Sequence, residues 1–522
     1  MSVRSVQSPE VRPGMADHAV SGTGWSAFQG IANKLATMAS IVVVARYLDP
    51  TDYGASGLVQ GIGGFLVLLP PLVMGDVLIA HERHLGSVRG VARRVVLLSA
   101  MASAATIALS IPVFVGLYPK FPGGTLAALL LVFAVRPLAD AFCVVPLTRL
   151  RSGLRFRAIA AIDGTVQLLA TAASIAMAIS GAGALSLIMP QAAASALKAI
   201  LYLATARDSE PASTAAVTGR RALAWGRRLR RQFFVAALAQ HAHTLISNLP
   251  MLVLARISSD EQTGIYTFAF YLSVQATFVI SYQVAAVLQP IFAKLGHDRE
   301  RQAKGFLRVI AAVGALAVPL ALLQAVLAEP LLRILFGDRW MSAVPTLAAL
   351  SVGQAFFFAV APTMAMLRAQ GRFRALLAWQ LLQLVLSVGV YSLAAAGGAL
   401  PVAIVDTCIW GLSVPIMVWV CVRRTGVAIS EALRPVVAPW LTALPIALVT
   451  WLAWQSLRPW QYPGAAVSVL IVGPLAGVAS LAAIRVSQPA TYAELAPMVS
   501  RAAGAFARLP RAAIARLARR SP

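Results

Sequence analysis

Six ionisable side chains lie inside long apolar stretches of this sequence, where a charge is costly. They are Lys34, Arg136, Asp140, Lys198, His241 and His243. A charged group at such a position usually faces a partner or a water-filled cavity rather than lipid. Lysine and arginine bind phosphate oxygens strongly in surroundings of low dielectric, and they repel cationic ligands. These residues therefore predict a binding site for an anionic cargo, with Asp140 as an ion or salt-bridge partner.

Two of the cations have a second explanation. Arg136 precedes Pro137 and lies one turn before Asp140, so an internal ion pair beside a helix kink explains it as well as ligand binding does. Lys198 is about two turns from a helix end and could extend to the membrane surface. The other acids in apolar stretches are expected to cap helices or to hydrogen-bond locally: Asp76, Asp163 and Asp406.

The sequence contains no pattern typical of an enzyme or a metal site. His241 and His243 are two positions apart, which puts them on different faces of a helix, and no carboxylate cluster accompanies them. A phosphate-binding Gly-rich loop that ends in Gly-Lys-Ser or Gly-Lys-Thr is missing. We therefore predict no catalytic residue, no metal and no cofactor.

Composition assigns the chain to the polytopic membrane proteins. Of its 522 residues, 59% are hydrophobic and only 12% are charged, about half the charged fraction of a soluble domain. The formal net charge of +25 favours the anionic lipid surface rather than nucleic acid, because the basic residues lie between apolar stretches. The polar, proline-containing first twenty residues do not resemble a cleavable signal peptide.

Counting apolar runs of about 20 residues, the length that crosses a bilayer, gives fourteen predicted spans. They lie near 23–45, 54–80, 91–117, 124–147, 158–180, 183–205, 233–255, 264–290, 307–328, 341–367, 375–396, 399–422, 436–456 and 463–484. With both termini on the cytoplasmic side, 35 of the 44 Lys and Arg residues fall in cytoplasmic segments and 6 in external loops. This asymmetry agrees with the tendency of cytoplasmic loops to carry basic residues.

An internal repeat divides the spans into two lobes. Residues 45–54 lead from one apolar helix through a short acidic loop to Gly54, and residues 255–264 repeat this arrangement 210 positions later, ending at Gly264. Repeats at this separation are typical of transporters built from two related lobes. Chance agreement between two helices rich in Ala and Val is the alternative explanation.

The predicted all-α architecture has two six-helix lobes and two further helices. The expected segments are a cytoplasmic extension (1–20), the first lobe (21–205), a basic cytoplasmic linker (206–232), the second lobe (233–425), helices thirteen and fourteen (426–486) and a basic tail (487–522). The tail is either an amphipathic helix on the inner leaflet or a solvated end.

Several loop sequences carry a resemblance. Residues 45–54 read Ala-Arg-Tyr-Leu-Asp-Pro-Thr-Asp-Tyr-Gly, residues 264–266 read Gly-Ile-Tyr, residues 335–340 read Leu-Phe-Gly-Asp-Arg-Trp, and residues 370–372 read Gln-Gly-Arg. These blocks resemble the span ends of polysaccharide-export flippases of the Wzx type, within the multidrug/oligosaccharidyl-lipid/polysaccharide exporter superfamily. Residues 74–76, Met-Gly-Asp, depart from the family's Asp-x-Gly. No binding residue carries over, because the matching blocks are span ends and loops.

The resemblance implies a MATE-like, two-lobed, fourteen-helix fold that works by alternating access. The implied activity is export of an undecaprenyl-diphosphate-linked oligosaccharide across a bacterial inner membrane, for exopolysaccharide, capsule or O-antigen synthesis. The implied partners are this lipid-linked sugar and membrane lipid, with a polysaccharide polymerase and a chain-length regulator as candidate protein partners.

Two other functions remain as alternatives. A cation-coupled multidrug exporter of the same superfamily would need an uncompensated acid in the middle of the first or seventh span, where this chain has Lys34, His241 and His243. A membrane polymerase or ligase would need a substantial external loop, and every predicted external loop is short. The sequence therefore favours a flippase, which is not an enzyme.

Overall fold

The computed structural model describes residues 37–67, 85–152, 155–207, 238, 241–275, 292, 295, 298–370 and 372–493. Within these ranges every regular element is a helix. The chain forms two compact units: unit 1 comprises Met1–Thr267 and Leu377–Ala399, and unit 2 comprises Phe268–Leu376 and Leu400–Pro522. The predicted lobes have other boundaries, and they stay a prediction.

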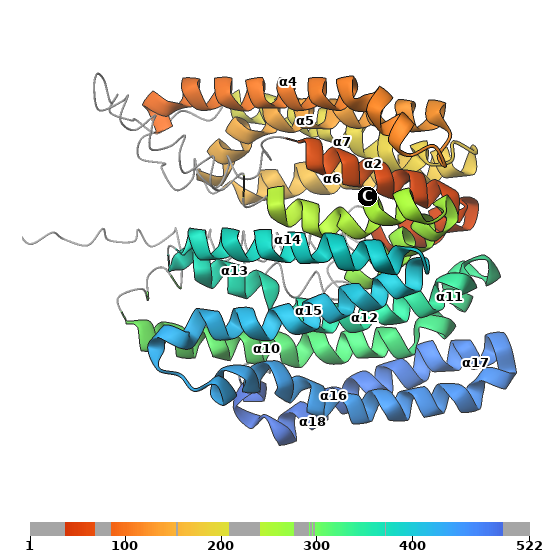
Figure 1. The fold of residues 1–522 in the computed structure, drawn as a ribbon, viewed down its shortest axis with the longest axis vertical. Coiled ribbons are helices and arrows are strands. Elements are labelled where there is room, and N and C mark those ends of the chain that lie inside the picture. The colour runs from red at the N-terminus through yellow and green to blue at the C-terminus, as the bar shows by residue number, and fades with distance from the viewer. Residues whose placement is uncertain are drawn as a thin grey trace, which may run out of the picture. The chain divides into compact units, whose positions relative to one another are not determined.

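Unit 1 contains the first half of the helices and one later helix (Figure 1). Its elements are Thr37–Tyr47, α2 (Pro50–Leu66), α4 (Leu85–Leu117), α5 (Gly123–Ser152), α6 (Phe156–Ile179), α7 (Leu185–Arg207), helix 241–257, the start of helix 260–275, and most of α14 (Phe373–Ala395). Helix α5 packs along α4 and α7, and α6 packs along α7. A hydrophobic core that includes Leu58, Leu130 and Ile188 holds α2, α5 and α7 together.

The two copies of the repeat cross each other inside unit 1. A Cβ atom added to Gly54 would lie 2.5 Å from the carbonyl oxygen of Asp260, and one added to Gly264 would lie closer still to the carbonyl oxygen of Pro50. Pro50 and Asp260 are themselves equivalent positions, 210 residues apart. The crossing is therefore reciprocal, as expected for two related segments that meet about a pseudo-twofold axis.

Several positions of the 45–54 block have a structural role at this crossing. Ala45 and Leu48 are fully buried, and Pro50 takes the first position of α2, where its missing N–H costs no hydrogen bond. The Asp52 carboxylate accepts the backbone N–H of Asp49 at 3.2 Å, which satisfies a donor at the start of the helix. Gly54 then allows the close approach. The block thus specifies a helix start and a crossing.

Unit 2 contains the remaining helices. They are α10 (Arg299–Val326), α11 (Ala328–Phe336), η2 (Asp338–Ala343), α12 (Val344–Phe357), α13 (Val360–Ala369), α15 (Ala399–Val422), η3 (Arg423–Thr425), α16 (Ile429–Leu457), η4 (Arg458–Trp460), α17 (Gln461–Val467), η5 (Ser468–Val472) and α18 (Gly473–Ser487). Helix α10 lies along both α12 and α16, and α16 lies along α18 (Figure 1). Helices α16 to α18 are therefore packed on the rest of the unit.

An ion-pair network fixes the turn between α16 and α17. The Glu329 carboxylate lies 3.1 Å from the Arg333 guanidinium on its own helix and 3.2 Å from Arg458 Nε. Tyr462 donates a long hydrogen bond of 3.5 Å to Asp338. Because Glu329 is largely buried, its two arginines compensate a charge that would otherwise be costly.

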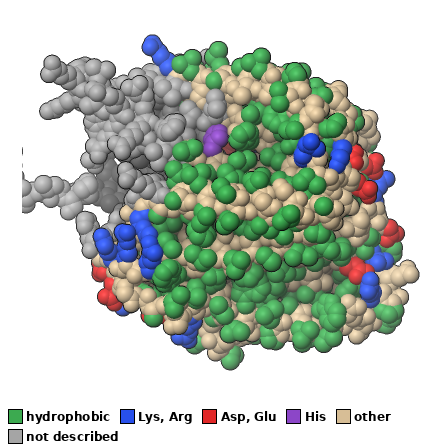
Figure 2. Space-filling view, in the orientation of Figure 1, with side chains coloured by type: hydrophobic (Ala, Val, Ile, Leu, Met, Phe, Trp, Pro, Cys, Tyr) green, Lys and Arg blue, Asp and Glu red, His purple; other side chains and the backbone are tan. Residues whose placement is uncertain are grey.

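Nine helical segments of the described ranges are long and apolar enough to cross a membrane. Eight of them each coincide with one predicted span, and the ninth, Ile429–Ser487, contains the predicted spans 436–456 and 463–484. The predicted spans 23–45, 54–80, 233–255 and 264–290 extend into residues outside the described part, so the number fourteen stays a prediction. Figure 2 shows hydrophobic side chains over the middles of the helices and charged side chains towards their ends. The chain is a multi-pass membrane protein.

Candidate functional site

Arg136 and Asp140 form an ion pair in the middle of α5. Arg136 Nε lies 3.7 Å from the Asp140 carboxylate, one helical turn along the same face. The guanidinium also lies over the Phe133 ring, 6.0 Å from its centroid. The ion pair that was expected as one explanation of Arg136 and Asp140 is therefore present. Because it uses only Nε, it leaves the two terminal nitrogens of Arg136 able to donate to a ligand.

A second ion pair joins α6 to α7. Lys198 Nζ lies 3.3 Å from Asp163 Oδ1, and about a third of each side chain is exposed. Lys198 therefore pairs with a residue of the neighbouring helix. Asp163, which was expected to cap a helix or to hydrogen-bond locally, instead forms an ion pair with another helix. Both residues are far from the turn at 180–184 that connects their helices.

The two ion pairs lie on three mutually packed helices, α5, α6 and α7, and we call them together the charged cluster. The cluster carries two cations and two carboxylates, so its formal charge is zero. An anionic group could bind here by displacing one of the two carboxylates. By itself the cluster is not a purely positive cavity.

The Lys198–Asp163 pair predicts a measurable coupling. Lys198→Met leaves the Asp163 carboxylate without its cation in an apolar bundle, and Asp163→Asn does the reverse, so each should lower the unfolding temperature. The double variant removes both charges and should recover most of the loss, which corresponds to a coupling of about 1 kcal/mol. Thermal unfolding of the purified variants in detergent measures this cycle.

The matched control is the pair Lys304–Glu300 on α10. Its atoms are closer, at 2.6 Å, yet both side chains are about two-thirds exposed. Lys304→Met and Glu300→Gln should therefore show little or no coupling, because water screens an exposed pair. Additive effects of Lys198→Met and Asp163→Asn would contradict the interpretation of the α6–α7 pair.

The other three predicted cations are Lys34, His241 and His243. Lys34 lies outside the described residues, as does Asp76. His241 and His243 lie in the described helical stretch 241–257, both partly buried, and the backbone oxygen of His243 accepts the Ser247 hydroxyl at 3.0 Å. The described part of the chain brings together no group of three potential metal ligands. Of the predicted cations, Arg136 and Lys198 each form an ion pair in the described part of the chain.

The loop between α4 and α5 holds the far end of helix 241–257. Lys120 Nζ donates to the carbonyl oxygens of Ile257, at 2.9 Å, and Ser258, where a cation favourably caps the helix C-terminus. The Tyr118 hydroxyl donates to Leu252 O at 3.4 Å. Burial raises the pKa of Tyr118, with a smaller opposing effect of Arg256, so the phenol keeps the proton it donates. These contacts fix the helix that carries both histidines.

The Gln-Gly-Arg turn of unit 2 also has a structural explanation. Arg372 Nη1 donates to Val420 O at 2.7 Å, near the end of α15. Burial and the neighbouring Arg424 lower the pKa of Arg372. Gln370 donates to Cys421 O at 3.2 Å. This turn is thereby anchored to α15, and its arginine acts on the backbone of the protein itself.

Sequence reasoning missed the Lys198–Asp163 pair, although a signal for it exists. Helices α6 and α7 are joined by a short turn, so they form an antiparallel hairpin. Residues at similar distances from its centre, near 182, must lie side by side, and positions 163 and 198 satisfy this within one helical turn. Two opposite charges at such positions inside apolar helices indicate a pair.

Comparisons with known proteins agree with the fold. The chain is 24% identical over 429 residues to the succinoglycan biosynthesis transport protein ExoT of Rhizobium meliloti, covering 82% of this chain and 84% of that protein. The solved structure of lipid II flippase MurJ in an inward closed conformation matches 89% of this chain and 99% of its own, with a TM-score of 0.65 at 12% identity. An inward-facing multidrug resistance MATE family transporter of the MOP superfamily matches 76% and 96%, with a TM-score of 0.53 at 15% identity.

The fold is thus that of MurJ and the MATE transporters, and the resemblance to Wzx-type flippases is confirmed. A family model described as "Polysaccharide biosynthesis protein" matches residues 43–345, more than half of the chain. It spans the 45–54 block, the charged cluster and the Leu-Phe-Gly-Asp-Arg-Trp loop. The chain therefore belongs to this family of polysaccharide biosynthesis membrane proteins.

Proposed function

We propose that this protein is a flippase that moves an undecaprenyl-diphosphate-linked oligosaccharide from the inner to the outer leaflet of a bacterial inner membrane. The observation that carries the proposal is the combination of its family with its fold. A polysaccharide biosynthesis family model covers residues 43–345, and the lipid II flippase fold extends over 89% of the chain. ExoT, a transport protein by name, supports the same class of cargo.

The charged cluster of α5, α6 and α7 is the proposed contact for the diphosphate. The terminal nitrogens of Arg136 can donate to phosphate oxygens while Nε keeps its position beside Asp140. Lys198 can exchange Asp163 for phosphate, since both side chains are about one-third exposed. Lys34, His241 and His243 stay candidates for the same head group.

In the proposed transport cycle, two related lobes alternate in their access to the two leaflets while the polyprenyl tail stays in lipid. The repeat crossing supports two lobes with a common pattern. Both termini lie in the cytoplasm in this proposal, as the distribution of Lys and Arg favours. A polysaccharide polymerase and a chain-length regulator of the same pathway are its proposed protein partners.

Depletion of the protein tests this function directly. Lipid-linked oligosaccharide should accumulate intact on the inner leaflet and surface polymer should disappear. A membrane-impermeant glycosidase or lectin, applied to intact spheroplasts and to inverted vesicles, measures the two leaflet pools separately. Re-expression of the wild type should restore the outer pool, whereas Arg136→Ala, once shown to insert normally, should restore it about tenfold less well, the effect of losing one charged contact.

Repeat units that reach the outer leaflet and stay unpolymerised would contradict the proposal and favour a polymerase or ligase. Unchanged polymer together with sensitivity to cationic drugs would instead favour a multidrug exporter. That alternative needs an uncompensated acid in the middle of the first or seventh predicted span, where this chain has Lys34, His241 and His243. Export of a lipid-linked sugar is therefore the better supported function.

A further inference from the structure

Helix α14 is amphipathic, with its polar side buried and its apolar side exposed, the reverse of a helix in a soluble protein. Its buried positions from the second turn onward are Gln380, Gln383, Ser387, Tyr391 and Ala395, at steps of three and four residues. Its exposed positions are large and apolar: Leu381, Leu382, Val385, Leu386 and Leu393. Helix α14 therefore presents hydrocarbon to its surroundings and a narrow polar stripe to the interior. We call Gln380, Gln383 and Ser387 the polar face of α14.

Each residue of the polar face has a buried polar atom without a hydrogen bond in the described part of the chain. Gln380, Gln383 and Ser387 are 3%, 7% and 1% exposed, and buried polar atoms of each, Oε1, Nε2 and Oγ, lack a hydrogen bond. The indole Nε1 of Trp379, beside them, is also buried without a partner. Buried polar groups in native proteins are nearly always paired, and in a membrane the cost of leaving them unpaired is higher. Three such groups on one face thus indicate a ligand that pairs with them.

The chemistry of the polar face identifies the kind of ligand. Each glutamine offers both amide donors and a carbonyl acceptor, and the serine hydroxyl is both donor and acceptor. The unpaired atoms are an acceptor, Gln380 Oε1, a donor, Gln383 Nε2, and the Ser387 hydroxyl. A diphosphate only accepts hydrogen bonds and would leave Gln380 Oε1 unpaired, and a cation would leave Gln383 Nε2 unpaired. Sugar hydroxyls donate and accept, so they can satisfy all three side chains.

The dimensions of the polar face also suit a short sugar chain. Ser387 is seven positions after Gln380, which is about 10 Å along a helix. This length is comparable to a disaccharide. Trp379 adds an aromatic ring with a polar edge, a side chain that offers both an apolar surface and a donor.

We propose that the polar face of α14 binds the hydroxyl groups of the oligosaccharide head group, separately from the charged cluster that binds its diphosphate. This assignment rests on the proposed flippase function and adds to it the sugar-recognising residues. It predicts that the polar face distinguishes a carrier lipid with sugar from the same carrier without sugar.

Binding to the purified full-length protein in nanodiscs tests the assignment. The two probes are undecaprenyl-diphosphate-linked oligosaccharide extracted from the producing cells and undecaprenyl diphosphate alone. The variants are Gln380→Met with Gln383→Met, which keeps side-chain length and removes the polar atoms, and Ser387→Ala. The matched control is Ser392→Ala on the same helix, whose hydroxyl already donates to Val388 O at 2.7 Å.

The glutamine double variant should bind the sugar-bearing lipid at least about tenfold more weakly, with binding of the bare carrier unchanged. Ser387→Ala should weaken sugar-lipid binding severalfold, and Ser392→Ala should leave it unchanged. The double variant should unfold at the same temperature as the wild type or a higher one, because it removes buried groups that have no protein partner. A merely structural role for the glutamines would lower that temperature.

Three results would overturn the assignment. Equal weakening of both probes would mean that the variants disturb the fold or the diphosphate contact, and unchanged binding of both would mean that the polar face contacts only water. In either case wild-type binding of the sugar-bearing lipid would still support the flippase. Failure of the wild type to bind either lipid would overturn the proposed function and this assignment together.

Discussion

Gly264→Ala should lower the unfolding temperature of the purified protein strongly, because the new methyl group has no space. Its Cβ would overlap the carbonyl oxygen of Pro50, which belongs to the backbone of the other repeat copy. A flexible side chain could rotate away, whereas a backbone oxygen can move only with its helix. We expect a loss of about 3 kcal/mol in the free energy of unfolding, the upper part of the range for overpacking. Thermal unfolding in detergent measures it.

Gly389→Ala provides the control for this substitution. Gly389 lies in the interior of α14, and a Cβ atom there meets nothing within 4 Å. Alanine has the higher helix propensity, so this variant should be as stable as the wild type or about 0.5–1 kcal/mol more stable. Equal unfolding temperatures for Gly264→Ala and Gly389→Ala would contradict the close crossing.

The reciprocity of the crossing adds a second check. Gly54→Ala should also destabilise the protein, since its Cβ would lie 2.5 Å from Asp260 O. The two substitutions push apart the same pair of helix starts. Once one has separated them, the second should cost less, so the loss in the double variant should be smaller than the sum of the single losses.

Span positions could be predicted from the sequence because the bilayer sets both the length and the composition of a crossing helix. The segments Ala158–Ile179 and Ala399–Thr425 begin where the apolar runs begin. After Ile429 the predicted spans 436–456 and 463–484 are separated by a short gap, and η4 (Arg458–Trp460) lies in that gap. The π-helical turn η5 (Ser468–Val472) lies inside the second of these spans. Hydropathy detects the crossing of lipid, and local hydrogen-bond geometry decides where such a helix breaks.

The candidate site was only partly predictable. The pairing of Arg136 with Asp140 follows from a spacing of four on one helix, so the sequence contains it. The partner of Lys198 is 35 positions away, on another helix, and depends on how α6 packs against α7. The polar face of α14 was missed for a different reason: a hydropathy average over a whole span hides three polar residues among many leucines and valines.

The family-like loop blocks, in contrast, proved to be structural. Gly54 allows the helix crossing, Arg372 anchors a turn to α15, and Trp340 fills a buried aromatic cluster. Residues that identify the family therefore need not contact the cargo. This is why recognition of the family from these blocks assigned the fold but no binding residue.

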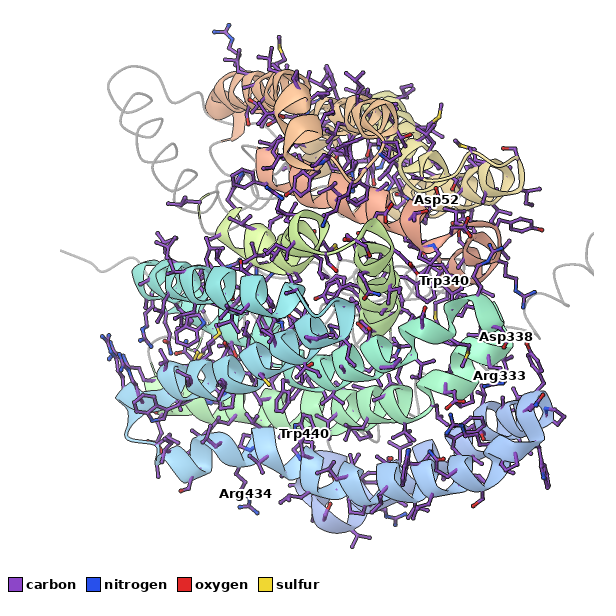
Figure 3. All side chains as sticks on the ribbon, turned by 45° about the vertical axis from the view of Figure 1, so that its right-hand side comes forward. Asp52, Arg333, Asp338, Trp340, Arg434 and Trp440 are labelled. Atoms are coloured by element: carbon purple, nitrogen blue, oxygen red, sulfur yellow. The ribbon has the colours of Figure 1, made fainter. Side chains whose placement is uncertain are left out.

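Trp340→Ala should be among the most destabilising substitutions in unit 2. Trp340, labelled in Figure 3, is fully buried. Its ring stacks on Phe268 with centroids 3.9 Å apart. Phe336 contacts the other side of this cluster, edge to face with Phe268 at 5.0 Å. The Leu-Phe-Gly-Asp-Arg-Trp loop thus attaches α11 and η2 to helix 260–275. Truncating the indole leaves a large cavity, which typically costs about 3–5 kcal/mol.

Trp460→Ala is the matched control, because Trp460 is 64% exposed and truncation there leaves no internal cavity. Trp340→Phe should lose less than Trp340→Ala, since a ring remains to stack on Phe268. Unfolding followed by intrinsic fluorescence or calorimetry in detergent should therefore rank the variants Trp460→Ala, Trp340→Phe, Trp340→Ala from most to least stable. If Trp340→Ala were as stable as Trp460→Ala, the loop could not hold α11 and η2 through this cluster, and the ion pairs of Glu329 would have to hold them instead.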